Sequence, residues 1–151
     1  MRVVVQRVAG AAVAVDGDRV GSIDTGLLAL LGVADGDGPD DVDVLVDKLV
    51  GLRVFPDDEG RMNRSVADAG GSVLLVSQFT LLADVRRGRR PSFTGAADPA
   101  VAEPLVDRAA ERIRAAGVPC ATGTFGAAME VSLVNDGPVT IVLDVVGGRV
   151  R

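Results

Sequence analysis

The chain has 151 residues, of which 48% are hydrophobic and only 3% are aromatic, and its formal net charge is −5. Such a hydrophobic chain is not disordered, and its acidic balance argues against a protein that coats nucleic acid without selectivity. Histidine is absent, which excludes Ser-His and Cys-His catalysis, an imidazole general base and most zinc sites.

The first third of the sequence is rich in Val, Leu and Ala, and it predicts β-structure. The expected strands lie at residues 2–8, 11–15, 19–23 and 27–33, and Asp16-Gly17-Asp18 is typical of a hairpin turn. The run at 27–33 is apolar throughout, which is typical of a strand buried on both faces.

Two helices are predicted. The first spans about residues 39–52, with Pro39 in its first turn and apolar residues at helical spacing. The second begins at Asp98-Pro99, an N-cap followed by proline, and ends before Gly117.

The remaining segments are shorter. We expect strands at 53–55, 72–80, 120–124, 129–134 and 139–146, and a long basic loop at 82–97. Asn135-Asp136-Gly137-Pro138 is read as the hairpin turn between the last two strands. This order predicts one α+β domain over residues 1–151, with 147–151 as a tail. Its core is a mainly antiparallel β-sheet or partial β-barrel with two packed α-helices.

The sequence lacks the features of a secreted or a membrane protein. A single cysteine, Cys120, cannot form an internal disulfide, and no apolar run reaches membrane-spanning length. The N-terminus becomes polar too early for a signal peptide. We therefore expect a cytosolic protein with no membrane contact, no metal and no cofactor.

Four segments are candidates for chemistry, and each also has a structural explanation. Ser77 to Leu81 ends a buried strand in polar groups, and it either binds a ligand or merely terminates the strand. Gly137-Pro138 permits a cis peptide bond, although most X-Pro bonds are trans. The arginines at 86, 87, 89 and 90 either hold phosphate or are solvated. Phe125 and Met129 either line a pocket or pack in the core.

Together these segments resemble the D-aminoacyl-tRNA deacylase family. The resemblance rests on Met1 to Val8, Arg53-Val54-Phe55, Met62-Asn63 and Ser77 to Leu81. It continues through Gly88 to Phe93, Phe125-Gly126 with Met129, and Asn135 to Thr140. It runs in order over residues 1 to about 145. Leu82 departs from it, since the family often has an aromatic residue there.

The resemblance implies a homodimeric enzyme that cleaves the ester between a D-amino acid and the 3′ end of tRNA, and that also clears mischarged glycine. The implied catalytic residues are Ser77, Gln78, Phe79 and Thr80. Substrate binding and chiral selection fall to Gly137 and Pro138, reaching from one subunit into the pocket of the other, and to Arg7, Phe125, Met129 and Ala102. Arg86, Arg87, Arg89 and Arg90 are candidates for tRNA binding, and DNA is not an expected partner.

Without histidine, a Thr80 nucleophile has no base. We therefore favour attack by water, with backbone N–H groups near Phe79 and Thr80 as the oxyanion site and help from the ribose 2′-hydroxyl. The competing interpretations are a non-catalytic RNA-binding dimeric β-domain and a purely structural dimer.

Overall fold

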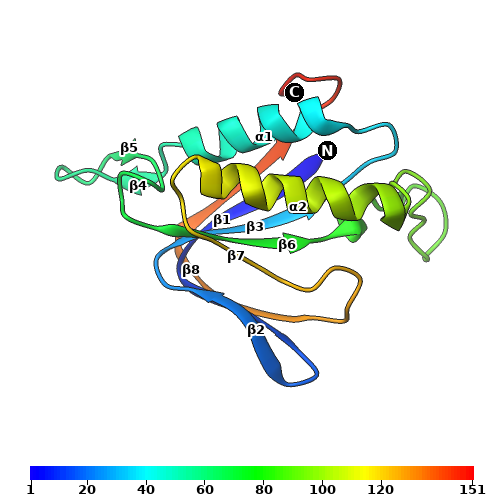
Figure 1. The fold of residues 1–151 in the computed structure, drawn as a ribbon, viewed down its shortest axis with the longest axis horizontal. Coiled ribbons are helices and arrows are strands. Elements are labelled where there is room, and N and C mark those ends of the chain that lie inside the picture. Colours follow the sequence, from blue (N-terminus) through cyan, green and yellow to red (C-terminus); the bar gives the residue numbers. More distant parts are fainter.

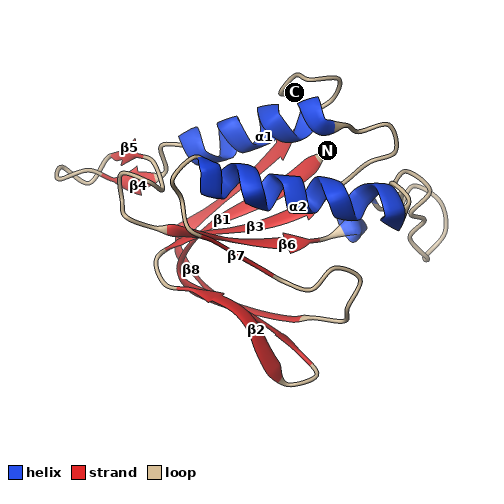
Figure 2. Ribbon diagram, in the orientation of Figure 1, coloured by secondary structure: helices blue, strands red, loops and turns tan.

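The computed structural model describes all 151 residues, folded as a curled sheet with two helices across one face (Figures 1 and 2). The helices are α1 (Pro39–Gly51) and α2 (Pro99–Ala115), and a short 3-10 helix, η1, spans Phe79–Leu82. The strands are β1 (Arg2–Val15), β2 (Asp18–Ile23), β3 (Gly26–Gly32), β4 (Phe55–Pro56), β5 (Met62–Arg64), β6 (Ser72–Ser77), β7 (Cys120–Thr122) and β8 (Glu130–Asp144).

The main sheet has the order β2-β1-β3-β6-β7, and β8 pairs with β1. All pairs that include β1 are antiparallel, whereas β6 is parallel to both β3 and β7. The sheet curls until β2 contacts β7, which leaves a partial barrel (Figure 1). The predicted α+β class with two packed helices is confirmed.

Two predicted features of the strands are wrong. Residues 2–8 and 11–15 are one strand, β1, since Gly10 stays in the ladder opposite Val134 instead of breaking it. The segment from Asn135 to Pro138 is no hairpin turn. It lies inside β8, and β8 pairs with the same strand on both sides of it.

The segment at 136–138 bulges out of β8 because one asparagine bridges its base. The backbone N–H of Val139 donates to Oδ1 of Asn135 at 2.9 Å, and Nδ2 of Asn135 donates to the carbonyl of Val139. Gln6 and Val8 of β1 pair with residues of β8 on either side of this closed loop, whereas Arg7 between them has no pairing partner in β8. The residues that suggested a turn therefore form a bulge.

The predicted loop at 82–97 also contains more structure than expected. It begins inside η1, and an antiparallel bridge joins Asp84 to Ser92. The expected strand at 53–55 is displaced to Phe55–Pro56, where it forms a small ribbon with β5, a strand that was not predicted.

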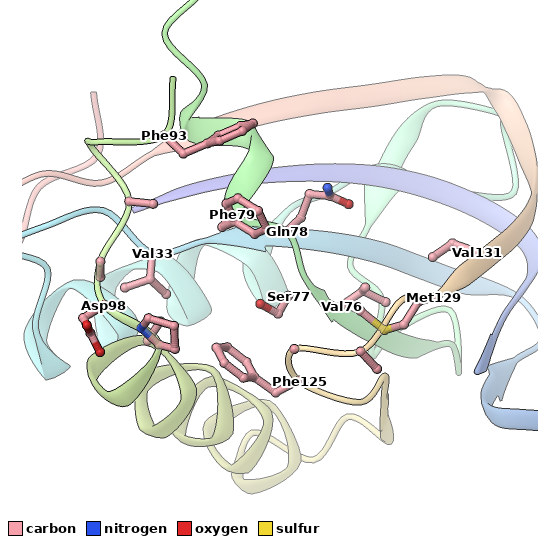
Figure 3. A pocket seen from close by; sticks show the side chains of 16 residues that line it. Val33, Val76, Ser77, Gln78, Phe79, Phe93, Asp98, Phe125, Met129 and Val131 are labelled. Carbon is pink, nitrogen blue, oxygen red and sulfur yellow. The ribbon is translucent and has the colours of Figure 1, made fainter. Parts of the chain in front are cut away.

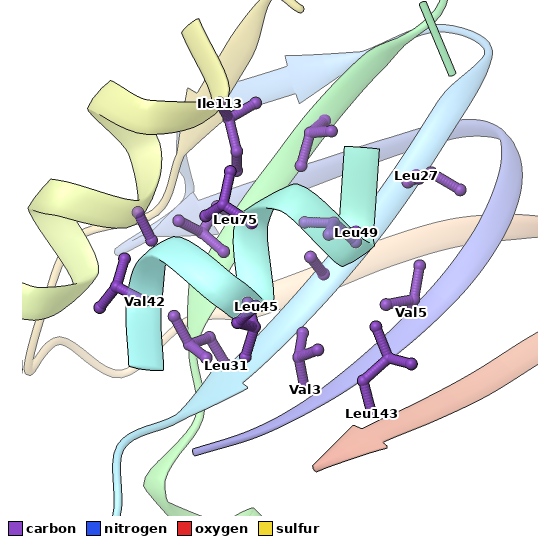
Figure 4. Close-up of a cluster of buried hydrophobic side chains, with 14 of the residues drawn as sticks. Val3, Val5, Leu27, Leu31, Val42, Leu45, Leu49, Leu75, Ile113 and Leu143 are labelled. Atoms are coloured by element: carbon purple, nitrogen blue, oxygen red, sulfur yellow. The ribbon is translucent and has the colours of Figure 1, made fainter. Parts of the chain in front are cut away.

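The main core lies between the sheet and the helices (Figure 4). Leu45 and Leu49 of α1 and Ile113 of α2 are fully buried there. Each such side chain stabilises the fold by about 1.5–3 kcal/mol relative to an exposed one. A smaller core fills the curl of the sheet and includes Val13 and Val76. Neither helix combines the length and the apolar character needed to cross a membrane.

Candidate functional site

The site is built at the end of β6. Val73 to Val76 are buried because both faces of this strand are covered, and the next residue, Ser77, is partly exposed. The backbone N–H of Gln78 donates to the carbonyl of Leu31 at 2.7 Å, and the chain then turns into η1. The polar end of the apolar run therefore lies at the edge of the sheet, as the sequence predicts.

A cavity of about 750 Å³ opens at this edge (Figure 3). Its walls come from the end of β6, the first turns of α2, the segment 93–97 and the segment from Phe125 to Val131. Most of the lining residues are hydrophobic, and three of the chain's four phenylalanines are among them: Phe79, Phe93 and Phe125. In a chain with so few aromatic residues, this concentration indicates a site for a flat or apolar ligand.

The predicted site residues divide into separate groups. Those that line the cavity are Ser77, Gln78, Phe79, Ala102, Phe125 and Met129. Thr80 lies next to the cavity but does not line it, and its hydroxyl oxygen accepts a hydrogen bond from Nε2 of Gln78. Ala102 reaches the cavity from α2, whose N-cap is the carboxylate of Asp98.

The backbone of η1 supplies hydrogen-bond donors beside Ser77. The N–H of Leu81 donates to the carbonyl of Gln78 at 3.2 Å. The amides of Phe79 and Thr80 come earlier in η1, and the first amides of a helix have no acceptor within it. This is the position at which the sequence analysis predicts an oxyanion site.

Arg7, Gly137 and Pro138 form a second group on the bulge of β8. Nε of Arg7 donates to the carbonyl of Asp136 at 2.9 Å, and Nη1 donates to the carbonyl of Val54. The Gly137–Pro138 peptide bond is cis, and both residues are exposed. None of these three residues lines the cavity.

The register of the sheet separates the two groups. Ser77 lies level with Leu31 and hence with Val3, whereas the bulge lies opposite Arg7, four residues farther along β1. Four residues span about 13 Å, and three strand spacings between β6 and β8 add about 14 Å across the sheet. Measured along the sheet, the bulge is therefore about 20 Å from Ser77 of its own chain.

Titratable groups are scarce in the cavity. Asp98 is the only ionisable side chain in its lining. Cys120 does not line the cavity, and burial raises the pKa of its thiol to about 11, which disfavours the reactive thiolate. No group of three or more acidic, histidine or cysteine side chains is arranged to hold a metal ion.

Residues 4–144 match the family model described as D-Tyr-tRNA(Tyr) deacylase. The chain belongs to this family. A D-aminoacyl-tRNA deacylase of Thermomicrobium roseum is 60% identical over 95% of this chain and 94% of its own length. One from Chloroflexus aurantiacus is 57% identical, covering 95% and 90%. A solved structure titled c-Myc DNA Unwinding Element Binding Protein superposes with a TM-score of 0.90 at 39% identity, covering 95% and 98%.

The resemblance to the deacylase family is thus confirmed, but sequence reasoning missed several residues of the cavity. Phe93 contacts Phe79 edge to face, with ring centroids 5.0 Å apart. Val33 enters from the end of β3, and Asp98 was read only as a helix cap. Phe93 lies in a segment that resembles the family, and this was the one available signal. No feature of the sequence around Val33 predicts that it lines the cavity.

Proposed function

We propose that this chain hydrolyses the ester bond of D-aminoacyl-tRNA, releasing the free D-amino acid and tRNA. The observation that supports this most strongly is the cavity at the end of β6. It brings Ser77, Gln78 and Phe79, to which the family resemblance assigns catalysis, together with Phe125 and Met129, to which it assigns substrate binding.

The character of the cavity suits the end of an aminoacyl-tRNA. A nucleobase stacks on aromatic side chains, with about 1–3 kcal/mol per base. Phe79, Phe93 and Phe125 offer such surfaces, and the hydroxyl of Ser77 lies between Phe79 and Phe125 (Figure 3). The ester would then sit beside the first amides of η1.

In the proposed mechanism, water attacks the ester carbonyl while the amides of Phe79 and Thr80 stabilise the negative oxygen. Each such donor lowers the barrier by about 3–4 kcal/mol. The substrate's ribose 2′-hydroxyl assists the proton transfer. Asp98, the one ionisable group in the cavity lining, already accepts a hydrogen bond from the N–H of Ala100, at 2.9 Å. The hydroxyl of Thr80 is hydrogen-bonded to Gln78 and to no carboxylate, so no base is in place to activate it and we assign it no nucleophilic role.

Selection of D-amino acids is proposed to come from the bulge of a second subunit in a homodimer. A bulge that lies about 20 Å from its own Ser77 needs a partner's cavity to act on substrate. Val134 and Val142 of β8, which are 64% and 56% exposed, offer apolar surface to that partner. Backbone at 136–138 would block an L side chain and hold the amino group, with Arg7 fixing the position of the bulge. Glycine has no side chain on either face, so glycyl-tRNA mischarged on tRNA-Ala would also be cleaved.

The first experiment separates an enzyme from a binding protein. Single-turnover incubation of the protein with D-aminoacyl-tRNA should release free amino acid. Ala127→Phe, which places a large side chain in the cavity, should abolish release while leaving the melting temperature within a few degrees of wild type. Retention of uncleaved substrate would support the non-catalytic RNA-binding alternative, and indifference to it would support a purely structural dimer. Tighter retention of single-stranded DNA than of tRNA would point to a DNA-binding protein instead.

A second experiment tests the cross-subunit arrangement with mixed dimers. Gly137 has a φ of +143°, and a Cβ there would lie 2.7 Å from the backbone nitrogen of Val139, so Gly137→Val should distort the bulge. An equal mixture of the Gly137→Val and Ala127→Phe proteins should regain about a quarter of wild-type activity. Half of the dimers in such a mixture contain one subunit of each kind, and one of the two sites in these dimers has both an intact cavity and an intact bulge. If the two variants form mixed dimers and regain nothing, the bulge and the cavity act within one chain.

A further inference from the structure

A closed basic loop lies beside the cavity, at the end of α2 that begins with Pro99 (Figure 1). Its base is the bridge between Asp84 and Ser92, in which each backbone N–H donates to the other residue's carbonyl, at 2.7 and 2.9 Å. Between these residues the chain carries four exposed arginines. The loop therefore holds a strong positive charge on an otherwise acidic chain.

The four arginines are not equivalent. Arg86 donates from Nε and Nη2 to the carboxylate of Asp84, at 2.9 and 2.6 Å. This pair holds the pKa of Asp84 below its ordinary value and neutralises one of the four charges. The other three arginines make no ion pair and no side-chain hydrogen bond; they are Arg87, Arg89 and Arg90.

One aromatic contact joins the loop to the cavity. Phe93 follows the bridge residue Ser92, lines the cavity, and packs edge to face against Phe79. Arg90 is three residues from Phe93, so their Cα atoms are at most about 11 Å apart. The segment that carries the unpaired arginines therefore begins within about 11 Å of a residue that lines the cavity.

We propose that Arg87, Arg89 and Arg90 form a phosphate subsite for the single-stranded RNA immediately 5′ of the nucleoside held in the cavity, whereas Arg86 braces the loop. This inference rests on the proposed function, because the strand reaches the loop only if its terminal nucleoside occupies the cavity. Arginine suits the role, since its planar fork pairs with two phosphate oxygens at once. The subsite allows a chain with a net charge of −5 to bind RNA locally.

The test compares two triple variants of equal charge. The loop variant is Arg87→Gln/Arg89→Gln/Arg90→Gln. The control removes three exposed arginines that lie outside the loop: Arg61→Gln/Arg149→Gln/Arg151→Gln. Binding of uncharged tRNA is measured by fluorescence anisotropy at several salt concentrations, with intact tRNA and with tRNA trimmed of its single-stranded 3′ end.

The loop variant should bind intact tRNA at least about tenfold more weakly than wild type, and its slope of log affinity against log salt should be shallower by about 2, because each lost contact to a single strand removes about 0.7. The control should keep the wild-type slope. Trimmed tRNA should bind wild type and loop variant alike. Equal slopes for all three proteins, or an equal loss with trimmed tRNA, would overturn the subsite.

A catalytic readout separates this inference from the proposed function. With 3′-O-(D-aminoacyl)adenosine, which has no phosphate, the loop variant should match wild type in kcat/KM, whereas with D-aminoacyl-tRNA its KM should rise. A loss on both substrates would mean that the arginines do not act through phosphate. If wild type hydrolyses neither substrate, the proposed function fails, and the salt slopes still decide whether the loop binds the strand.

Discussion

Replacing Gly123 by alanine tests whether the packing of Met129 sets the size of the cavity. A Cβ at position 123 would lie 2.7 Å from Sδ of Met129, whereas such atoms pack best at about 3.5–4.0 Å. The methyl group would also lie 3.7 Å from a methyl of Val13, an ordinary contact. The side chain of Met129 must therefore move by about 1 Å. The open space available to it is the cavity that it lines, so the move makes the cavity smaller.

The expected cost falls on substrate binding more than on folding, because a methionine side chain adapts at little cost. We expect Gly123→Ala to change the free energy of unfolding by less than about 1.5 kcal/mol and to raise KM for D-aminoacyl-tRNA by about threefold to tenfold. Denaturant unfolding and steady-state kinetics measure the two effects. Gly51→Ala, at a glycine with open space around it in α1, is the matched control and should leave KM unchanged.

A double-mutant cycle shows whether Met129 transmits the effect. In a Met129→Val background no sulfur lies in the path of the new methyl group, so Gly123→Ala should then leave KM unaltered. A rise in KM of the same size with and without Met129 would refute this reasoning, as would Gly123→Ala with wild-type KM.

Three further predictions concern the nucleophile, the dimer and acid stability. Thr80→Ala should lower kcat by about tenfold or less, the loss of one neutral hydrogen bond; a fall of about ten-thousandfold in a folded protein would make Thr80 the nucleophile. Val142→Asp, on exposed β8 surface, should give monomers in analytical ultracentrifugation together with loss of activity, and an intact dimer would contradict the proposed interface. The amides of Gly148 and Gly38 hold the pKa of buried Asp41 below its ordinary value, so its stabilisation is complete above about pH 4 and is lost as pH falls through the lowered pKa. Asp41→Asn should therefore lower the free energy of unfolding at pH 7 by about 1.5 kcal/mol and by less at pH 3; an equal loss at both pH values would exclude the carboxylate charge as the cause.

Local patterns predicted much of the fold. The Asp98-Pro99 signal placed the start of α2 correctly, because an N-cap carboxylate and a first-turn proline act within a few residues. The apolar run at 27–33 likewise identified β3 as a strand covered on both faces. The strand expected at 72–80 begins where β6 begins but ends three residues too late, since Phe79 and Thr80 lie in η1.

What local patterns missed depends on partners distant in the chain. Asn135 to Pro138 has the composition of a turn, yet pairing of both flanks with β1 makes it a bulge. Separate strands were expected at 2–8 and 11–15, yet β1 runs through both segments. Val33 joins the cavity only because the chain after β3 packs beside η1 and α2, and no spacing in the sequence encodes that meeting.

The sequence also did not predict which of the four loop arginines is paired. All four look alike in sequence, although Asp84 lies only two positions before Arg86 and the structure pairs it with Arg86 alone. Arg7 is a similar case. The resemblance placed it with substrate, whereas the fold gives it hydrogen bonds to the bulge and to Val54.

The most direct test of the proposed activity is the ratio of single-turnover rates for matched D- and L-aminoacyl-tRNA that carry the same amino acid on the same tRNA. The account predicts rapid release of the D-amino acid, with the L-ester decaying no faster than in buffer alone. Equal rates for the two esters, or no hydrolysis of either, would contradict it.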